Sequence, residues 1–145
     1  MSLNIKIDLY KKLVGFLTKK GQKIKAKQII NSAFLIVSKK TKYSLPYLLV
    51  KIFLKLNTFV EAKTVRIKRS SHIVPFSLTL KRRSYLIIKW LIKAVSENST
   101  KTSIVNKIAD EILNILTNSN SKALKYKQLN NIQAFSNRSK IHYRW

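Results

Sequence analysis

The chain has 145 residues, of which 30 are Lys or Arg and only five are Asp or Glu, so its formal net charge is +25. Hydrophobic residues make up 46% of the chain, which separates it from disordered basic tails. The absence of cysteine excludes disulfides, cysteine-ligated zinc and thiol catalysis. We predict one folded domain over residues 1–145 whose cationic surface binds a polyanion, for which nucleic acid is the leading candidate.

Apolar residues at helical spacing predict three helices in the first part of the chain, at about residues 8–20, 22–38 and 44–57. Gly21 is expected to stop the first helix, because Gly adopts the left-handed cap conformation at little cost. Ser44 is expected to cap the third helix, whose first turn tolerates Pro46.

The periodicity changes after the third helix. Val65 and Ile67 alternate with basic residues, and the run that contains Phe76 alternates with hydroxyl residues, so we predict a β-hairpin at about residues 61–80. The polar stretch at residues 68–71 contains no Gly or Asn, which favours a longer loop over a tight turn. Pro75 is expected at an exposed edge of the ribbon.

Helical spacing then returns and predicts three more helices, at about residues 82–97, 101–117 and 123–138. The first is apolar nearly all round, which is typical of a central, buried helix. Thr100 or Thr102 is expected to cap the second. The last is expected to pack one side against the protein through a weak apolar stripe of Leu124, Leu129, Ile132 and Phe135, and to face RNA with the other. The predicted fold class is therefore mainly α, with about six helices and a projecting basic hairpin between helices three and four.

Few residues could support catalysis. The only histidines are His72 and His142. Asp110 and Glu111 are adjacent, so on a helix they point about 100° apart, and we interpret both as offsetting neighbouring Lys charge. No Gly-rich phosphate loop, metal-ligand spacing or nucleophile elbow is present. We predict that the protein is not an enzyme and uses no cofactor or metal.

Basic residues gather in three patches that we interpret as phosphate contacts. The patch between the first two helices contains Lys19, Lys20, Lys23, Lys25 and Lys27. The patch of the hairpin and its exit contains Lys63, Arg66, Lys68, Arg69, Lys81, Arg82 and Arg83. The carboxyl-terminal patch contains Lys122, Lys125, Lys127, Arg138, Lys140 and Arg144. Nearby aromatic residues, such as Trp145, can stack on unpaired bases.

Residue usage indicates an A+T-rich genome. Lys (24), Ile (18) and Asn (11), whose codons are A+T-rich, are all frequent. Residues 1–10 show no signal or transit peptide, so we expect synthesis inside an organelle. A mitochondrial location is our prediction, with another organelle or the cytoplasm of a reduced-genome organism as the alternative.

Short segments along most of the chain resemble, in order, the universal small-subunit ribosomal protein seven family. The family's Val-Pro-Val-Glu-Val, Arg-Arg and Ile-Arg-Trp-Leu are similar to Val74-Pro75-Phe76-Ser77-Leu78, Arg82-Arg83 and Ile88-Lys89-Trp90-Leu91 in the same register. Further matches are Lys101-Thr102, Ala109-Asp110-Glu111-Ile112-Leu113, Asn137-Arg138 and the closing His142-Tyr143-Arg144-Trp145. The chain departs from the family at the hairpin turn, where Lys68-Arg69 replaces Gly-Gly.

The resemblance implies a structural protein that binds the three-prime major domain of small-subunit rRNA early and organises the head, beside other head and platform proteins. It also implies that the hairpin and last helix lie near the exit-site tRNA and the mRNA exit path. We assign rRNA binding to Lys19, Lys20, Lys23, Lys25, Lys63, Arg66, Lys81, Arg82, Arg83, Lys101, Lys125, Lys127 and Arg138. We assign proximity to tRNA or mRNA to Lys68, Arg69, His142, Tyr143, Arg144 and Trp145.

Two alternatives stay open. A general nucleic-acid architectural protein would bind duplex DNA as tightly as structured rRNA. A membrane-surface protein with basic amphipathic helices would bind anionic vesicles with little preference for RNA. We expect no membrane partner, because the apolar stripes fit an internal core and no apolar run reaches the ~18 residues that span a bilayer. If the ribosomal interpretation holds, replacing Arg82 and Arg83 together with Ala is expected to weaken rRNA binding and its salt dependence.

Overall fold

The computed structural model describes residues 3–99 and 101–143. Within them the α-helices are α1 (Leu3–Leu17), α2 (Lys23–Thr41), α3 (Leu45–Leu56), α4 (Leu80–Ser96), α5 (Ile104–Thr117) and α6 (Lys122–Ser136). Strands β1 (Val60–Ile67) and β2 (Ser70–Ser77) form an antiparallel hairpin between α3 and α4, and a 3-10 helix, η1 (Arg138–Tyr143), follows α6. The predicted fold class is confirmed. No helix of this described part is long and apolar enough to cross a membrane.

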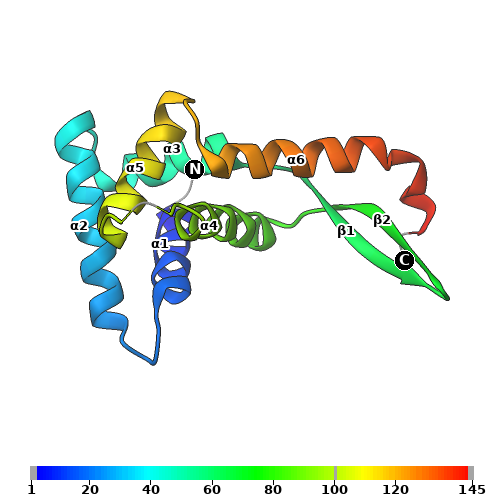
Figure 1. The fold of residues 1–145 in the computed structure, drawn as a ribbon, viewed down its shortest axis with the longest axis horizontal. Coiled ribbons are helices and arrows are strands. Elements are labelled where there is room, and N and C mark those ends of the chain that lie inside the picture. Colours follow the sequence, from blue (N-terminus) through cyan, green and yellow to red (C-terminus); the bar gives the residue numbers. More distant parts are fainter. Residues whose placement is uncertain (1–2, 100, 144–145) are drawn as a thin grey trace.

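The core lies where α1 to α5 pack together in a helical body (Figure 1). Helix α4 runs through this body, as its apolar sequence predicts, and buries Ile87, Ile88 and Leu91. Phe34 of α2 and Ile112 of α5 are also fully buried. Each such side chain stabilises the fold by roughly 1.5–3 kcal/mol, so the body is a rigid support for its charged surface.

Several helix ends differ from prediction because other residues make the caps. Helix α1 ends at Leu17, and Gly21 (φ 76°) lies in the turn before α2, so it does not stop α1. Ser44 occupies the N-cap of α3 as predicted. Helix α5 begins only at Ile104, because the Ser103 hydroxyl accepts the cap hydrogen bond from the Asn106 amide at 3.4 Å. Thr102 is therefore not the cap, and Thr100 lies outside the described residues.

The longer loop predicted for the hairpin is wrong. Ile67 pairs with Ser70, which leaves only Lys68 and Arg69 in a tight turn. Lys68 takes a left-handed φ of 52°. That conformation costs a non-glycine residue roughly 1–2 kcal/mol, and the strand pairs on either side offset the cost. The second strand ends at Ser77, earlier than predicted, because Leu80 already belongs to α4.

Helix α6 and the hairpin project from the same side of the body and lie side by side (Figure 1). Only the first two turns of α6 pack on the body, where Ala123 is buried and Tyr126 packs against the core. The predicted packing of its apolar stripe is therefore wrong beyond Leu124, since Leu129, Ile132 and Phe135 are 54%, 64% and 69% exposed. Pro75, expected to be exposed, is buried, because β2 is covered by α6 and η1.

Glu111 does not offset lysine charge, contrary to our interpretation. Its side chain is buried at the junction of α5 and α6. One carboxylate oxygen accepts hydrogen bonds from the Ser121 hydroxyl (2.7 Å) and the Ala123 amide (3.0 Å). Ser121 also caps α6 by accepting from the Leu124 amide. A carboxylate at a helix N-terminus is favoured by the helix dipole, so Glu111 fixes where α6 begins.

Candidate nucleic-acid interface

Side-chain amides of α6 hold the hairpin in place. Asn130 Oδ1 accepts from the Ala62 backbone amide at 3.1 Å, and Asn130 Nδ2 donates to the Val60 carbonyl at 2.8 Å. The Thr58 hydroxyl donates to Asn131 Oδ1 at 3.0 Å. These bonds satisfy backbone groups at the start of β1, so the hairpin leaves the body in a fixed direction.

An ion pair fixes the base of the hairpin to α4. The Arg82 guanidinium donates from Nε and Nη2 to the two carboxylate oxygens of Glu61, at 2.9 and 2.7 Å, and Lys63 Nζ lies 3.7 Å from the same carboxylate. Burial alone would raise the pKa of Glu61, but Arg82 and Lys63 outweigh it and lower that pKa below its ordinary value. The hydrogen bond with Glu61 raises the pKa of Arg82. Arg82, predicted to bind rRNA, thus already has an anionic partner in this fold.

The carboxyl-terminal segment reaches the outer part of the hairpin. The ring of Tyr143 stacks on that of His72, with centroids 5.0 Å apart and planes 14° from parallel. His142 lies beside them, with its Nδ1 2.9 Å from the Ser139 carbonyl oxygen. Tyr143 also lines a hollow with Lys68 and Arg69 of the turn. The structure therefore brings together four of the residues predicted to lie near tRNA or mRNA, whereas Arg144 and Trp145 lie outside the described residues.

Three cations of the hairpin have no ion-pair partner among residues 3–99 and 101–143. Arg66, Lys68 and Arg69 are exposed. Within the described ranges the ion pairs are those of Lys63 and Arg82 with Glu61 and of Lys93 with Glu97, so none reaches these three side chains. An uncompensated cationic ribbon of this kind attracts polyanions.

Two other residues predicted to bind rRNA have structural partners. Lys127 Nζ donates to the Lys55 carbonyl at 2.6 Å, and burial lowers the pKa of Lys127. Arg83 Nε donates to the Leu78 carbonyl at 3.2 Å, and its guanidinium lies 4.2 Å from the Phe59 ring centre. These contacts join α3, α4 and α6 around the base of the hairpin.

The remaining predicted contacts are exposed but dispersed. Lys19, Lys20, Lys23 and Lys25 lie at the turn between α1 and α2, on the body and away from the hairpin (Figure 1). The other exposed positions are Lys81 at the start of α4, Lys101 before α5, Lys125 on α6 and Arg138 at the start of η1. The structure thus places the lysines of the α1–α2 turn on a surface separate from the exposed cations of the hairpin and α6, and Lys101, before α5, belongs to neither.

Sequence reasoning missed a cationic and aromatic cluster at the start of α3. Lys51 Nζ lies 4.0 Å from the Tyr43 ring centre and 4.9 Å from that of Tyr47. A hydrogen bond with the Tyr43 hydroxyl is the main cause that raises the pKa of Lys51. Tyr47 and Lys51 are four residues apart on α3 and lie on one helical face, a spacing that could have revealed this part of the cluster, whereas Tyr43 precedes the helix. No group of three or more His, Cys, Asp or Glu side chains suited to a metal ion occurs in the described part of the chain.

The chain is a nucleic-acid-binding protein of mainly helical fold, because a helical body carries a cationic hairpin, β1 and β2, held in place by α6 and α4, and the net charge is +25. Residues 3–138 match the family model described as ribosomal protein S7p/S5e, so the chain belongs to this family of structural, non-enzymatic ribosomal proteins. The chain is 32% identical to the small ribosomal subunit protein uS7 of Geobacter metallireducens over 134 residues, which cover 92% of this chain and 85% of that protein. With the same coverage it is 34% identical to uS7 of Pelobacter propionicus and 30% to uS7 of Clostridioides difficile.

Proposed function

We propose that this protein is a component of the small ribosomal subunit, where it binds the three-prime major domain of the rRNA and helps to fold the head beside other head and platform proteins. The names of its relatives as small-subunit proteins support this role. The observation that carries it is the hairpin fixed by α6 and by the Arg82–Glu61 pair, on which the exposed Arg66 has no ion-pair partner among the described residues. Lysine and arginine contacts with phosphates provide affinity, while shape and stacking on unpaired bases provide selectivity.

We propose further that the tip of the hairpin and η1 lie near the exit-site tRNA and the mRNA exit path. The stacked rings of His72 and Tyr143, beside the basic turn, support this assignment. Aromatic and cationic side chains together suit single-stranded RNA, because rings stack on bases and cations meet phosphates. The helical body with its α1–α2 turn would then carry rRNA contacts independent of the tip.

The salt dependence of binding tests the rRNA assignment. We expect the protein to bind a transcript of the three-prime major domain, and Arg66→Ala with Lys81→Ala, two exposed positions assigned to rRNA, to reduce the slope of log K against log salt by about 0.7–0.9 for each phosphate that is no longer neutralised. This pair is a better test than the pair Arg82 and Arg83, because Arg82 is held by Glu61. Lys39→Ala with Lys40→Ala removes the same charge outside the proposed contacts and controls for it. Equal slopes for both double variants would remove the hairpin from the interface.

Shortening the turn tests the tRNA and mRNA assignment. Removal of residues 68–71 is expected to spare rRNA binding and to disturb tRNA or mRNA handling by assembled subunits. Replacing Lys68 and Arg69 with Asn and Gly keeps a tight turn and separates the effect of charge from that of structure. Loss of rRNA binding in the shortened variant would instead make the tip a primary rRNA contact. Equal affinity of the intact protein for duplex DNA would favour the architectural alternative.

We also propose that the protein is made and used inside mitochondria, on the matrix-side ribosome. The support is the frequency of residues with A+T-rich codons; the relatives named above are bacterial. Sucrose-gradient sedimentation of purified organelles and cytosol, in low and high salt, tests it. We expect the chain with the small subunit of mitochondrial ribosomes in both salts. Its presence only in plastid or cytosolic ribosomes would overturn the mitochondrial assignment.

A further inference from the structure

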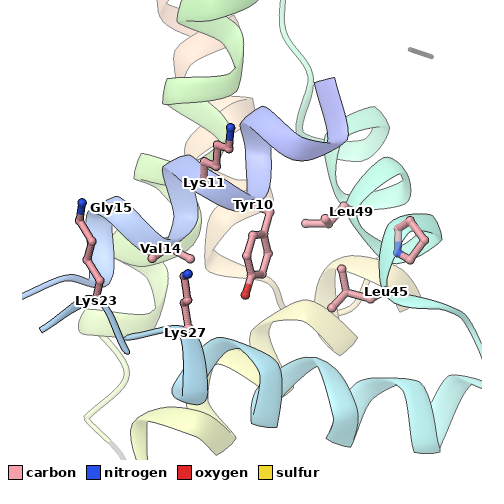
Figure 2. Close-up of a pocket in the computed structure, with 9 residues that line it drawn as sticks. Tyr10, Lys11, Val14, Gly15, Lys23, Lys27, Leu45 and Leu49 are labelled. Carbon is pink, nitrogen blue, oxygen red and sulfur yellow. The ribbon is translucent and has the colours of Figure 1, made fainter. Parts of the chain in front are cut away.

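A groove of about 700 Å³ opens between α1, α2 and α3 (Figure 2). Its floor is apolar and comes from Val14, Leu45, Pro46 and Leu49. The Tyr10 ring reaches from α1 toward α2 across the groove, and its hydroxyl donates to Asn31 Oδ1 at 2.9 Å. The groove therefore combines an aliphatic surface with an aromatic ring that is held in one orientation.

Exposed lysines line this groove. Lys11, Lys23 and Lys27 line it from α1 and α2, and all three are exposed. None belongs to an ion pair of the described ranges. An occupant that complements the groove needs a flat or apolar group for the floor and negative charge for the three ammonium groups.

Gly15 keeps the wall of the groove open. It lies within α1, where glycine is disfavoured relative to alanine. No heavy atom lies within 4 Å of the position that a Cβ would occupy, and the backbone there is not left-handed, so neither packing nor backbone conformation requires glycine. The absence of a side chain at this position leaves space on the part of the helix surface that lines the groove.

We propose that this groove binds one unpaired nucleotide of the rRNA, with the base against Tyr10 and the apolar floor and its flanking phosphates on Lys11, Lys23 and Lys27. The inference rests on the proposed rRNA-binding function and adds a ligand and a site to it. A nucleotide fits better than an acidic peptide, because it offers a flat ring for Tyr10 and because the whole chain, at +25, is built to meet phosphates.

Substitution of Gly15 tests the proposal without disturbing the core. Gly15→Leu places a side chain in the groove, and leucine favours a helix more than glycine does, so the variant should fold. We expect its affinity for the three-prime major domain transcript to fall about 5- to 150-fold, the range for loss of one stacked base. Gly15→Ala, which adds one methyl group, and Gln28→Leu, which adds leucine on α2 outside the groove, should bind like the wild type.

A thiol probe reads occupancy directly, since the natural chain has no cysteine. Iodoacetamide should modify the thiol introduced by Pro46→Cys more slowly once the transcript is bound. It should modify the exposed thiol introduced by Ser96→Cys at the same rate with and without the transcript. Wild-type affinity of Gly15→Leu, or equal modification with and without RNA, would overturn the groove proposal while leaving rRNA binding intact. Failure of the wild type to bind the transcript would instead overturn the proposed function. Normal RNA binding by Gly15→Leu with loss of a neighbouring protein from the subunit would assign the groove to a protein and also overturn the proposal.

Discussion

Replacing Arg82 with Ala leaves the carboxylate of Glu61 without its main partner at the base of the hairpin. The pair is held by two charge-assisted hydrogen bonds of 2.9 and 2.7 Å. Breaking a fully buried pair of this kind costs roughly 3–5 kcal/mol. The Glu61 side chain is only 11% exposed, but that of Arg82 is 39% exposed, so water screens part of the interaction. We expect Arg82→Ala to lower the free energy of unfolding by about 1–3 kcal/mol at pH 7.

The pH dependence of this loss has a definite sign. Because the folded-state pKa of Glu61 is lowered, the pair stabilises the protein above the ordinary carboxyl pKa of about 4.3 and ceases to do so as pH falls through the lower folded-state value. In Arg82→Ala the main attraction is gone, and burial favours the protonated acid. The difference in stability between wild type and variant should therefore be largest at neutral pH and shrink toward about pH 3.

Urea unfolding followed by far-ultraviolet circular dichroism, at about 0.15 M salt and at both pH values, measures this difference. Arg83→Ala is the matched control, because Arg83 contacts the Leu78 carbonyl and the Phe59 ring and no carboxylate. Its effect should not depend on pH between 3 and 7. An equal loss for Arg82→Ala at both ends of the pH range would refute the assignment of the pair as an ionic anchor.

Two further substitutions test local structure. Glu111→Ala should lower the free energy of unfolding by about 2–4 kcal/mol, because the Ser121 hydroxyl and the Ala123 amide lose their buried acceptor. Asp110→Ala, at the exposed neighbouring position, is the control, and equal melting temperatures of the two variants would contradict the role of Glu111. Lys68→Gly should raise the free energy of unfolding by about 0.5–1 kcal/mol, because glycine adopts the left-handed conformation at φ 52° without the strain that a side chain brings. Arg69→Gly is the control, and a melting temperature of Lys68→Gly below that of the wild type would refute the strain.

The sequence was sufficient to predict the elements that bury a continuous apolar face. The spacing of Ala26, Ile30 and Val37 predicted α2, and these residues are buried in the core. The apolar run from Leu86 to Ile92 predicted the central position of α4. In both cases the spacing of apolar residues along one helix determines which side chains are buried, so the sequence of that helix alone was sufficient for the prediction.

The errors arose where a residue's partner is distant in the chain or where pairing overrides a local preference. Nothing near Glu111 indicated that its carboxylate would bind the start of α6, ten and twelve positions later. The tight turn at Lys68 contradicts turn preferences and is imposed by the paired strands. The exposure of Phe135 depends on how far α6 extends beyond the body, which its own sequence does not encode.

The same contrast applies to the candidate interface. Composition and basic patches indicated a polyanion partner and located the exposed Arg66, Lys68 and Arg69. They could not distinguish these from Arg82 and Lys127, because a carboxylate 21 positions away and a carbonyl 72 positions away engage those two side chains. Which lysines and arginines are available for RNA is decided by tertiary contacts.

Because α6 and η1 support the hairpin, the hairpin can reach its final structure only after these later segments have been synthesised. Two isolated strands are marginally stable in water, and here their supports, Asn130 and Tyr143, are translated long after residue 77. As the chain emerges at about 5–20 residues per second, the body can fold while the ribbon still lacks these supports. The cationic ribbon therefore becomes a shaped surface only after α6 and η1 have been made, later than the body that carries it.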